Sequence, residues 1–371
     1  MATAARPGIA LGRILGVPVW LAPSWFIVAA IVIVLFEPNV AQASDVGRPA
    51  TYLVAGAFVL LLLVSVLVHE LAHAMSARAL AMPVDKIVLT LWGGHTQFAD
   101  EAPTPGRSAT VAVAGPLANA FLAGVGMLLL TQLDGGGVIR LLAVALVATN
   151  AFVAVFNLAP GLPLDGGRVV EAGVWALTGR RWRGTVVAGW CGRIVAVLVV
   201  FWALGWPVLQ GRSPGPFSLV WSLMIALMLW QGASSAVAVG RMHAGAEHLD
   251  LGRFIVPAVP SPVDTAQWQS IDPGRHIIAV DADGRPVGLL SAQARAELAT
   301  GVRPPPPGTA LAAVMTVLDP AVSIPARASG AQVLQALART PAHTYVVVDG
   351  AGAVVGLAQG QQLADAVTAR P

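Results

Sequence analysis

One stretch of the chain reads Ala57-Phe-Val-Leu-Leu-Leu-Leu-Val-Ser-Val-Leu-Val-His69-Glu70-Leu71-Ala72-His73, so three ionisable side chains follow directly on a long apolar run. On an α-helix, residues four positions apart share a face, so His69 and His73 can direct two imidazoles at one metal ion, with Glu70 beside them. An ionisable group at the centre of a membrane helix costs about 2.5 to 3.5 kcal/mol and usually serves a function. The stretch therefore predicts a membrane helix that carries a metal site.

The spacing also predicts which metal and which chemistry. Imidazole suits zinc, and a hydrolytic zinc site has three protein ligands and one open position for water. A glutamate directly after the first histidine is typical of the base that takes a proton from that water. We therefore predict one Zn²⁺ per chain, with His69 and His73 as ligands and Glu70 as the catalytic base. A chance match of three positions is the alternative, and the membrane context disfavours it.

A third ligand is needed, and it should be another histidine or a carboxylate. The candidates in the apolar part of the chain are His95, Glu37, Asp45, Asp85, Asp100, Glu101, Asp134, Asp165 and Glu171. Asp165 stands out, because Pro160 and Pro163 break the preceding helix and let irregular backbone line a polar cavity. Gly166 and Gly167 then allow a sharp turn past a metal ion. We predict Asp165 as the third ligand.

The composition is that of a membrane protein followed by a soluble domain. Of 371 residues, 56% are hydrophobic and only 11% are charged, whereas about a quarter of an ordinary soluble domain is charged. Uncharged stretches near the roughly 20 residues that a membrane helix needs lie at about Ile14–Phe36, Tyr52–Val68, Ser108–Leu133, Leu141–Leu164, Ile194–Gln210 and Phe217–Gly240. We predict a polytopic domain of six membrane helices over residues 1–245 and a soluble α+β domain over 246–371.

The distribution of cations predicts the orientation in the membrane. Short loops rich in Lys and Arg stay on the cytoplasmic side, and six crossings put most of the cations on the side of both termini: Arg6, Arg13, Arg78, Lys86, Arg107, Arg168, Arg180, Arg181 and Arg183. Both termini are therefore expected in the cytoplasm. The first apolar stretch lacks a small-residue cleavage site, so we expect it to remain as a helix.

Other classes of site are excluded by composition. The single cysteine, Cys191, permits neither a disulfide framework nor a cysteine-based zinc site. The cations are explained as topology determinants, and no basic patch is interleaved with aromatic residues, so nothing predicts nucleic-acid binding.

Four blocks in this order carry a resemblance to a known family: His69-Glu70-Leu71-Ala72-His73, Gly93-Gly94, Ala114-Gly115-Pro116-Leu117-Ala118-Asn119, and Asn157 through Asp165-Gly166-Gly167. The chain resembles the site-2 protease family of intramembrane zinc metalloproteases. The resemblance implies zinc bound by His69, His73 and Asp165 and water activated by Glu70. It also implies that Asn157 stabilises the oxyanion or positions the substrate. The alternative for Asn157 is a hydrogen bond to carbonyls freed by the helix break.

The resemblance further implies a small membrane-associated sheet around residues 84–98 that offers an edge strand to an unwound substrate. Gly93 and Gly94 would permit close approach of that substrate, and Asn119 is expected to contribute to substrate binding. A hydrogen bond between helices is the alternative for Asn119. His95 departs from the family pattern, which leaves an auxiliary metal or gating role and a simple interfacial hydrogen bond both open.

The C-terminal part contains two similar β-turn-β units, His276–Leu290 and Tyr345–Leu357, each with an Asp…Gly turn. They resemble a divergent pair of CBS modules. Nucleotide-binding CBS pairs carry an Asp three residues after a Ser or Thr to hold the ribose, but here Ser291 is followed by Ala294 and Gln359 by Gln362. Nucleotide binding is therefore doubtful, and a structural role or a homodimer through this domain is the expectation.

Together these patterns predict a zinc-dependent endopeptidase that cuts transmembrane segments of membrane-tethered proteins within the lipid bilayer. Family members release regulators such as anti-sigma factors, and the sequence selects no particular one. The alternative is a catalytically silent metal-binding scaffold or transporter-like sensor. Glu70 separates the two, because a pure binding site needs no base beside its first histidine.

Overall fold

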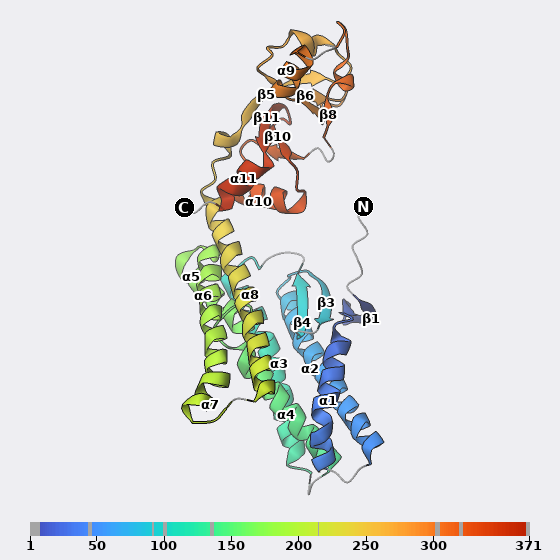
Figure 1. Ribbon diagram of the computed structural model, residues 1–371, viewed down its shortest axis with the longest axis vertical. Coiled ribbons are helices and arrows are strands. Elements are labelled where there is room, and N and C mark those ends of the chain that lie inside the picture. Colours follow the sequence, from blue (N-terminus) through green and yellow to red (C-terminus); the bar gives the residue numbers. More distant parts are fainter. Residues whose placement is uncertain are drawn as a thin grey trace. The chain divides into compact units, whose positions relative to one another are not determined.

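The structure is a computed structural model that describes residues 8–43, 47–90, 93–98, 102–133, 137–213, 215–300, 305–318 and 322–368. The chain divides into two compact units, Met1–Ala238 and Val239–Pro371 (Figure 1). Helix α8 (Pro216–Glu247) contributes residues to both units. Each unit is described by itself below.

Six helices among the described residues are long and apolar enough to cross a membrane. They are α1 (Trp25–Ala43), α2 (Arg48–Ala79), α3 (Pro105–Leu130), α4 (Val138–Asn157), the continuous run of α6 (Arg181–Val200), the π-helix η1 (Phe201–Gly205) and α7 (Trp206–Leu209), and α8. The predicted six-helix, multi-pass membrane domain is confirmed.

Two of the predicted spans begin at the wrong residue, and the second and fourth end at the wrong one, since they end at Ala79 and Asn157 and not at Val68 and Leu164. The first helix begins at Trp25 and not near Ile14, because Ile9–Ile14 and Val17–Leu21 are strands β1 and β2. Buried strand residues are as apolar as a membrane helix, so the uncharged run is longer than the helix it contains. The fifth span begins at Arg181 and not near Ile194, so it includes a cation, Arg193, that an uncharged window leaves out.

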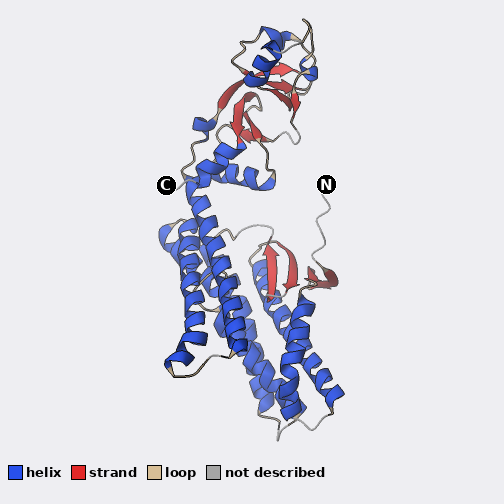
Figure 2. Ribbon diagram, viewed as in Figure 1, coloured by secondary structure: helices blue, strands red, loops and turns tan. Residues whose placement is uncertain are grey.

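A four-stranded sheet covers one end of α2 in the first unit (Figure 2). Its order is β1-β2-β3-β4, where β3 is Val84–Thr90 and β4 is Gly93–Phe98. Alternate residues of β2 and β3 turn inward and pack against α1 and α2; the buried members of this core are Val17, Val19, Leu21, Trp25, Ala74, Ile87 and Leu89. The predicted small sheet is present, and it has two more strands than the segment 84–98 indicated.

The break between α4 and α5 (Asp165–Thr178) is the feature that positions the site. Helix α4 ends at Asn157, seven residues of irregular chain follow, and α5 starts at Asp165. Proline denies the helix a backbone donor, which is the reason that the sequence predicted this interruption. Helix α3 packs against α2, α4 and α5, and the start of α5 lies against the C-terminal third of α2.

The second unit is an α+β domain with a seven-stranded sheet of order β8-β7-β6-β5-β11-β10-β9. The strands are β5 (Val256–Pro262), β6 (His276–Val280), β7 (Pro286–Leu290), β8 (Thr316–Val317), β9 (Ser323–Pro325), β10 (Thr344–Val348) and β11 (Val354–Gln359). The helices are α9 (Ala292–Thr300), α10 (Gly330–Arg339) and α11 (Gly360–Thr368).

The two predicted hairpins of this unit are confirmed, and they are built alike. The Asp281 Oδ1 atom accepts hydrogen bonds from the backbone N–H groups of Asp283 and Arg285, at 2.9 and 2.8 Å. Asp349 Oδ1 accepts from Ala351 and Ala353 in the same way, both at 2.9 Å. In each repeat the first strand of the hairpin also pairs in parallel with the strand before it, β6 with β5 and β10 with β9. The unit therefore consists of two similar α+β repeats in tandem.

Candidate active site

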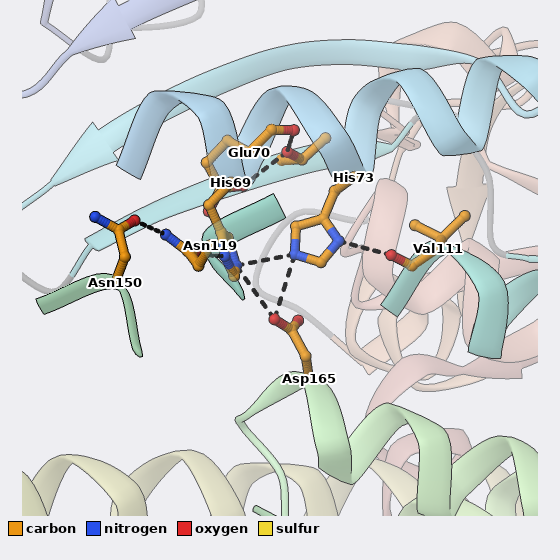
Figure 3. A network of polar contacts seen from close by, with 8 residues as sticks. His69, Glu70, His73, Val111, Asn119, Asn150 and Asp165 are labelled. Atoms are coloured by element: carbon orange, nitrogen blue, oxygen red, sulfur yellow. Dashed lines mark hydrogen bonds and ion pairs between the residues drawn. The ribbon is translucent and has the colours of Figure 1, made fainter. Parts of the chain in front are cut away.

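The site is centred on His69 and His73 of α2 and Asp165 of α5 (Figure 3). The Nε2 atoms of His69 and His73 lie 3.2 and 3.3 Å from Asp165 Oδ2. The two Nε2 atoms lie 3.1 Å from each other. Both imidazoles are buried, and among the described residues these three form the one group of His, Cys, Asp or Glu side chains close enough to share a metal ion.

The outer nitrogens of the two rings determine what this cluster can hold. His73 Nδ1 lies 2.7 Å from the backbone oxygen of Val111, and His69 Nδ1 contacts the side-chain oxygen of Asn119. Both partners are acceptors, so each Nδ1 carries a proton and each neutral ring presents an Nε2 lone pair. Two nitrogen lone pairs and a carboxylate oxygen therefore converge. A cation, either an extra proton or a metal ion, must lie among them, and this donor set fits zinc.

A chain of buried amides supports His69 from behind. Asn119 of α3 donates from Nδ2 to Asn150 Oδ1 of α4 over 2.7 Å. Asn150 donates in turn to Ser65 Oγ at 3.0 Å and to the backbone oxygen of Leu146 at 2.9 Å. Such outer partners fix the orientation and tautomer of a ligating histidine. The sequence prediction that Asn119 binds substrate stays a prediction, since its described side-chain contacts are to His69 and Asn150.

Helix α3 approaches the cluster through a residue without a side chain. A Cβ atom on Gly115 would lie 2.3 Å from His73 Nε2 and 2.6 Å from His69 Nε2. Both distances are shorter than any real contact, so only glycine leaves room for two nitrogens and a cation here.

Glu70 lies beside the cluster but outside it. Its Oε2 atom accepts a hydrogen bond of 2.7 Å from the hydroxyl of Thr96 on β4, and the side chain is 5% exposed. A Cβ on Gly94 of the same strand would lie 2.3 Å from Glu70 Cγ. The Glu70 side chain therefore fits against β4 because position 94 is glycine.

Asp165 is the one cluster member outside the six membrane helices. Burial alone would raise the pKa of its carboxyl group, but when an added proton charges the imidazoles, the hydrogen bonds and charges of His69 and His73 outweigh burial and hold that pKa well below its usual range. Asp165 is consequently a carboxylate at neutral pH.

A cavity of about 910 Å³ opens beside the cluster. Its wall includes all three cluster residues and Glu70, and most of the other residues predicted for the site, namely Gly93, Gly94, His95 and Asn157. His95 is exposed and contacts Gln97 across 3.2 Å. Asn119 is not among the described residues of the wall.

The remaining candidates for a third ligand lie away from the cluster or outside the described residues. Glu37 accepts a hydrogen bond from Thr51 at 2.9 Å, and Glu171 forms an ion pair with Arg181 at 3.1 Å. Asp85 lines the cavity but is not part of the metal-binding group. The candidates outside the described residues are Asp45, Asp100, Glu101 and Asp134.

Sequence reasoning missed the residues that position the cluster from other elements. Thr96 and the carbonyl of Val111 carry no local signal, because their partners are 26 and 38 residues away. Asn150 did offer one, since it is an amide in an otherwise apolar membrane helix, where polar side chains usually bond across helices.

Comparison with known proteins agrees with this geometry. The model of the family "Peptidase family M50" matches residues 57–143 and 131–202, which contain every residue of the cluster. The protein sll0528 of Synechocystis sp., whose name assigns it to the zinc metalloproteases, is 27% identical to this chain over 94% of the chain and 92% of its own length.

Two solved structures align with part of the chain. A site-2 protease from Methanocaldococcus jannaschii aligns with 62% of this chain and 94% of its own, at 23% identity and a TM-score of 0.43. The CBS domain of a bacterial CNNM/CorC family Mg²⁺ transporter aligns with 39% of this chain and 94% of its own, at 15% identity and a TM-score of 0.24. The family match over the residues of the cluster and the relative that aligns over nearly the whole chain lead to one conclusion: this protein is similar to the metallopeptidases of family M50.

Proposed function

We propose that the protein is a zinc-dependent endopeptidase that cuts transmembrane segments of membrane-tethered substrate proteins. The observation that carries the proposal is the position of the two histidines of the cluster within a membrane helix. His69 lies ten residues before the end of the span Pro49–Ala79, which is about 15 Å along an α-helix. A peptide bond that reaches this depth belongs to a segment inside the bilayer.

The roles of the chain's own residues follow from their places around the cavity. His69, His73 and Asp165 hold the zinc ion, which supplies Lewis-acid activation of water and of the scissile carbonyl. Glu70 takes a proton from the attacking water and returns it to the leaving amine. Asn157, in the cavity wall, offers its amide N–H₂ group to the substrate carbonyl.

Substrate binding is assigned to β4, which is one of the two edge strands of the sheet among the described strands and the one whose residues line the cavity. A transmembrane helix shields its own amides, so the substrate must unwind before it is cut. The unwound segment pairs with the free backbone groups of β4, and Gly93 and Gly94 let it come close. Membrane-tethered regulators such as anti-sigma factors fit this class of substrate.

Comparison of membrane fractions tests the function. Cells that carry the wild type or Glu70→Gln are compared by mass spectrometry of membrane-protein fragments, with Glu297→Gln, an exposed glutamate of the second unit, as the matched control. We expect new termini inside transmembrane segments with the wild type and the control, and none with Glu70→Gln, which keeps its zinc. If Glu70→Gln retains zinc and the fragments are unchanged, the silent scaffold or sensor is the better description.

We also propose that both termini lie in the cytoplasm, since the short loops rich in Arg and Lys then share that side. Replacing Cys191, the one cysteine, by serine gives a background for single-cysteine labelling. Pro103→Cys and Gln132→Cys flank α3 at exposed positions. A membrane-impermeant maleimide applied to intact cells should label position 132 and spare position 103; the reverse pattern contradicts this orientation.

A further inference from the structure

Strand β4 has two different faces. Successive side chains of a strand point to opposite sides, and here Gly94 and Thr96 face Glu70, whereas His95 and Gln97 contact each other. Toward Glu70 this face therefore presents only Gly94, which has no side chain, and the hydroxyl of Thr96, whereas Phe98 packs farther along α2 in the cluster of Ala77.

The Thr96 hydroxyl is matched to the Glu70 carboxylate. Its Oγ1 lies 2.7 Å from Glu70 Oε2 and 3.2 Å from the Glu70 backbone oxygen. A hydroxyl has one proton, so the shorter contact to the carboxylate is the stronger hydrogen bond. This bond occupies Oε2 and leaves Oε1 as the oxygen that can accept a proton from water.

A glutamate without such a contact would explore several rotamers. Two of its side-chain torsions each have three staggered minima, and the third is broader. When the base leaves its position beside the attacking water, the reaction slows. Thr96 removes that freedom from one side, and the close fit of Glu70 against Gly94 removes it from the other. Both constraints come from a single strand.

We propose that Thr96 is a positioning residue for the base, and that through Thr96 the strand that binds substrate also sets the orientation of Glu70. The inference rests on the proposed function, in which Glu70 is the base and β4 receives the substrate. A substrate segment that pairs with β4 is then aligned with the Glu70 carboxylate, because the same six-residue strand contacts both the substrate and Glu70.

The hydroxyl is tested by two substitutions and a matched control. Thr96→Val keeps the shape and removes the donor, while Thr96→Ser keeps the donor. Thr178→Val removes a hydroxyl that forms hydrogen bonds with Val174 of α5 and with Arg180, two residues beyond it. The substrate is a peptide that spans the cleavage site mapped in the wild-type membranes, and kcat, KM and zinc content are measured for each full-length variant.

We expect Thr96→Val to lower kcat by about 10- to 100-fold, the usual cost of losing a partner that orients a catalytic group. KM and zinc content should stay within about twofold of the wild type, and Thr96→Ser should restore most of kcat. In the Glu70→Gln background, Thr96→Val should add no further loss, because the two residues act as one unit.

Two kinds of result overturn the inference while leaving the proposed function intact. One is Thr96→Val with wild-type kcat beside an inactive Glu70→Gln. The other is a loss in Thr96→Val that Thr96→Ser does not rescue, or that appears as lost zinc or a raised KM, since each indicates a structural effect of position 96. Activity retained by Glu70→Gln is different, because it removes the proposed function itself.

Discussion

Each unit of this molecule buries a strongly polar group, and the two groups are satisfied in opposite ways. In the second unit the guanidinium of Arg295 donates to four backbone oxygens, those of Trp268, Ile271, Asp272 and Arg275. In the first unit, His69, His73 and Asp165 direct only acceptor atoms at one another once their outer partners are counted. Arg295 finds its hydrogen-bond acceptors within the chain, whereas the acceptor atoms of the cluster require an added cation.

The difference separates a structural buried polar group from a functional one. Buried donors and acceptors are normally paired, and a group that finds all its partners in the fold stabilises that fold. A set of acceptors without a donor is unfavourable by itself and becomes favourable only with an external ion. Four predictions test this contrast, beginning with the largest expected effect.

The most damaging change should be Gly115→Ala. The added methyl group would occupy the space between the two Nε2 atoms, so zinc affinity should fall by more than the roughly 10- to 100-fold that loss of an outer partner costs. Zinc analysis of the purified protein measures this. Gly124→Ala on the same helix meets nothing within 4 Å and should keep its metal. Full zinc in Gly115→Ala would show that the cluster relaxes around the methyl group.

Arg295→Leu should destabilise the second unit by about 3 kcal/mol, because it leaves several buried carbonyls without donors. Thermal unfolding of the full chain, followed with a probe in that unit, measures the loss. Zinc content should not change. Arg285→Leu removes an exposed arginine and should have little effect. A loss of zinc in Arg295→Leu would mean that the two polar centres are not independent.

Asn150→Leu should have a smaller effect on the cluster, about a tenfold loss of zinc affinity. It breaks the amide chain behind His69 but leaves all three ligands in place. Competition with a zinc chelator gives the affinity. Asn39→Leu, an exposed asparagine in α1, is the matched substitution and should leave it unchanged. Equal affinity in both variants would indicate that Asn119 alone fixes the ring.

The smallest effect is expected for nucleotides. The positions that would carry ribose-binding carboxylates are Ala294 and Gln362, so calorimetry with AMP or ATP at about 1 mM should give no heat of binding. The hydroxyl of Ser291 already accepts the N–H of Ala294 at 3.0 Å as a helix cap. Micromolar binding would restore a sensing role to the second unit.

The features of the site that the sequence predicted are those that depend on residues close together in the chain. Helical spacing predicted that His69 and His73 share a face, and the prolines before Asp165 predicted the break that frees it; in the structure the three do lie together. Their roles as ligands remain a prediction. The positions of Thr96, Val111 and Gly115 could not be predicted, because which strand or helix packs over a given turn of α2 depends on contacts across the whole unit.

In the fold, too, features that depend on nearby residues were predicted and features that depend on distant contacts were not. The number of membrane helices and the two hairpins of the second unit follow from run length and turn chemistry. Strands β1 and β2 did not, since β2 pairs with β3 and so joins Val19 to Ile87 across nearly seventy residues, and β1 pairs with β2. Alternation over the five residues of β2 was hidden within a longer apolar run.

The donor set of the cluster has a consequence for metal supply in the cell. Two imidazole nitrogens and one carboxylate oxygen do not by themselves favour zinc, because sites of this kind follow the Irving–Williams order, in which copper binds more tightly. The group contains no sulfur ligand that would favour one metal over another. Its three ligand atoms all lie within 4.8 Å of one another. Which metal occupies the protein therefore depends on what the cell makes available while the chain folds, so the growth medium becomes a variable in every assay of its activity.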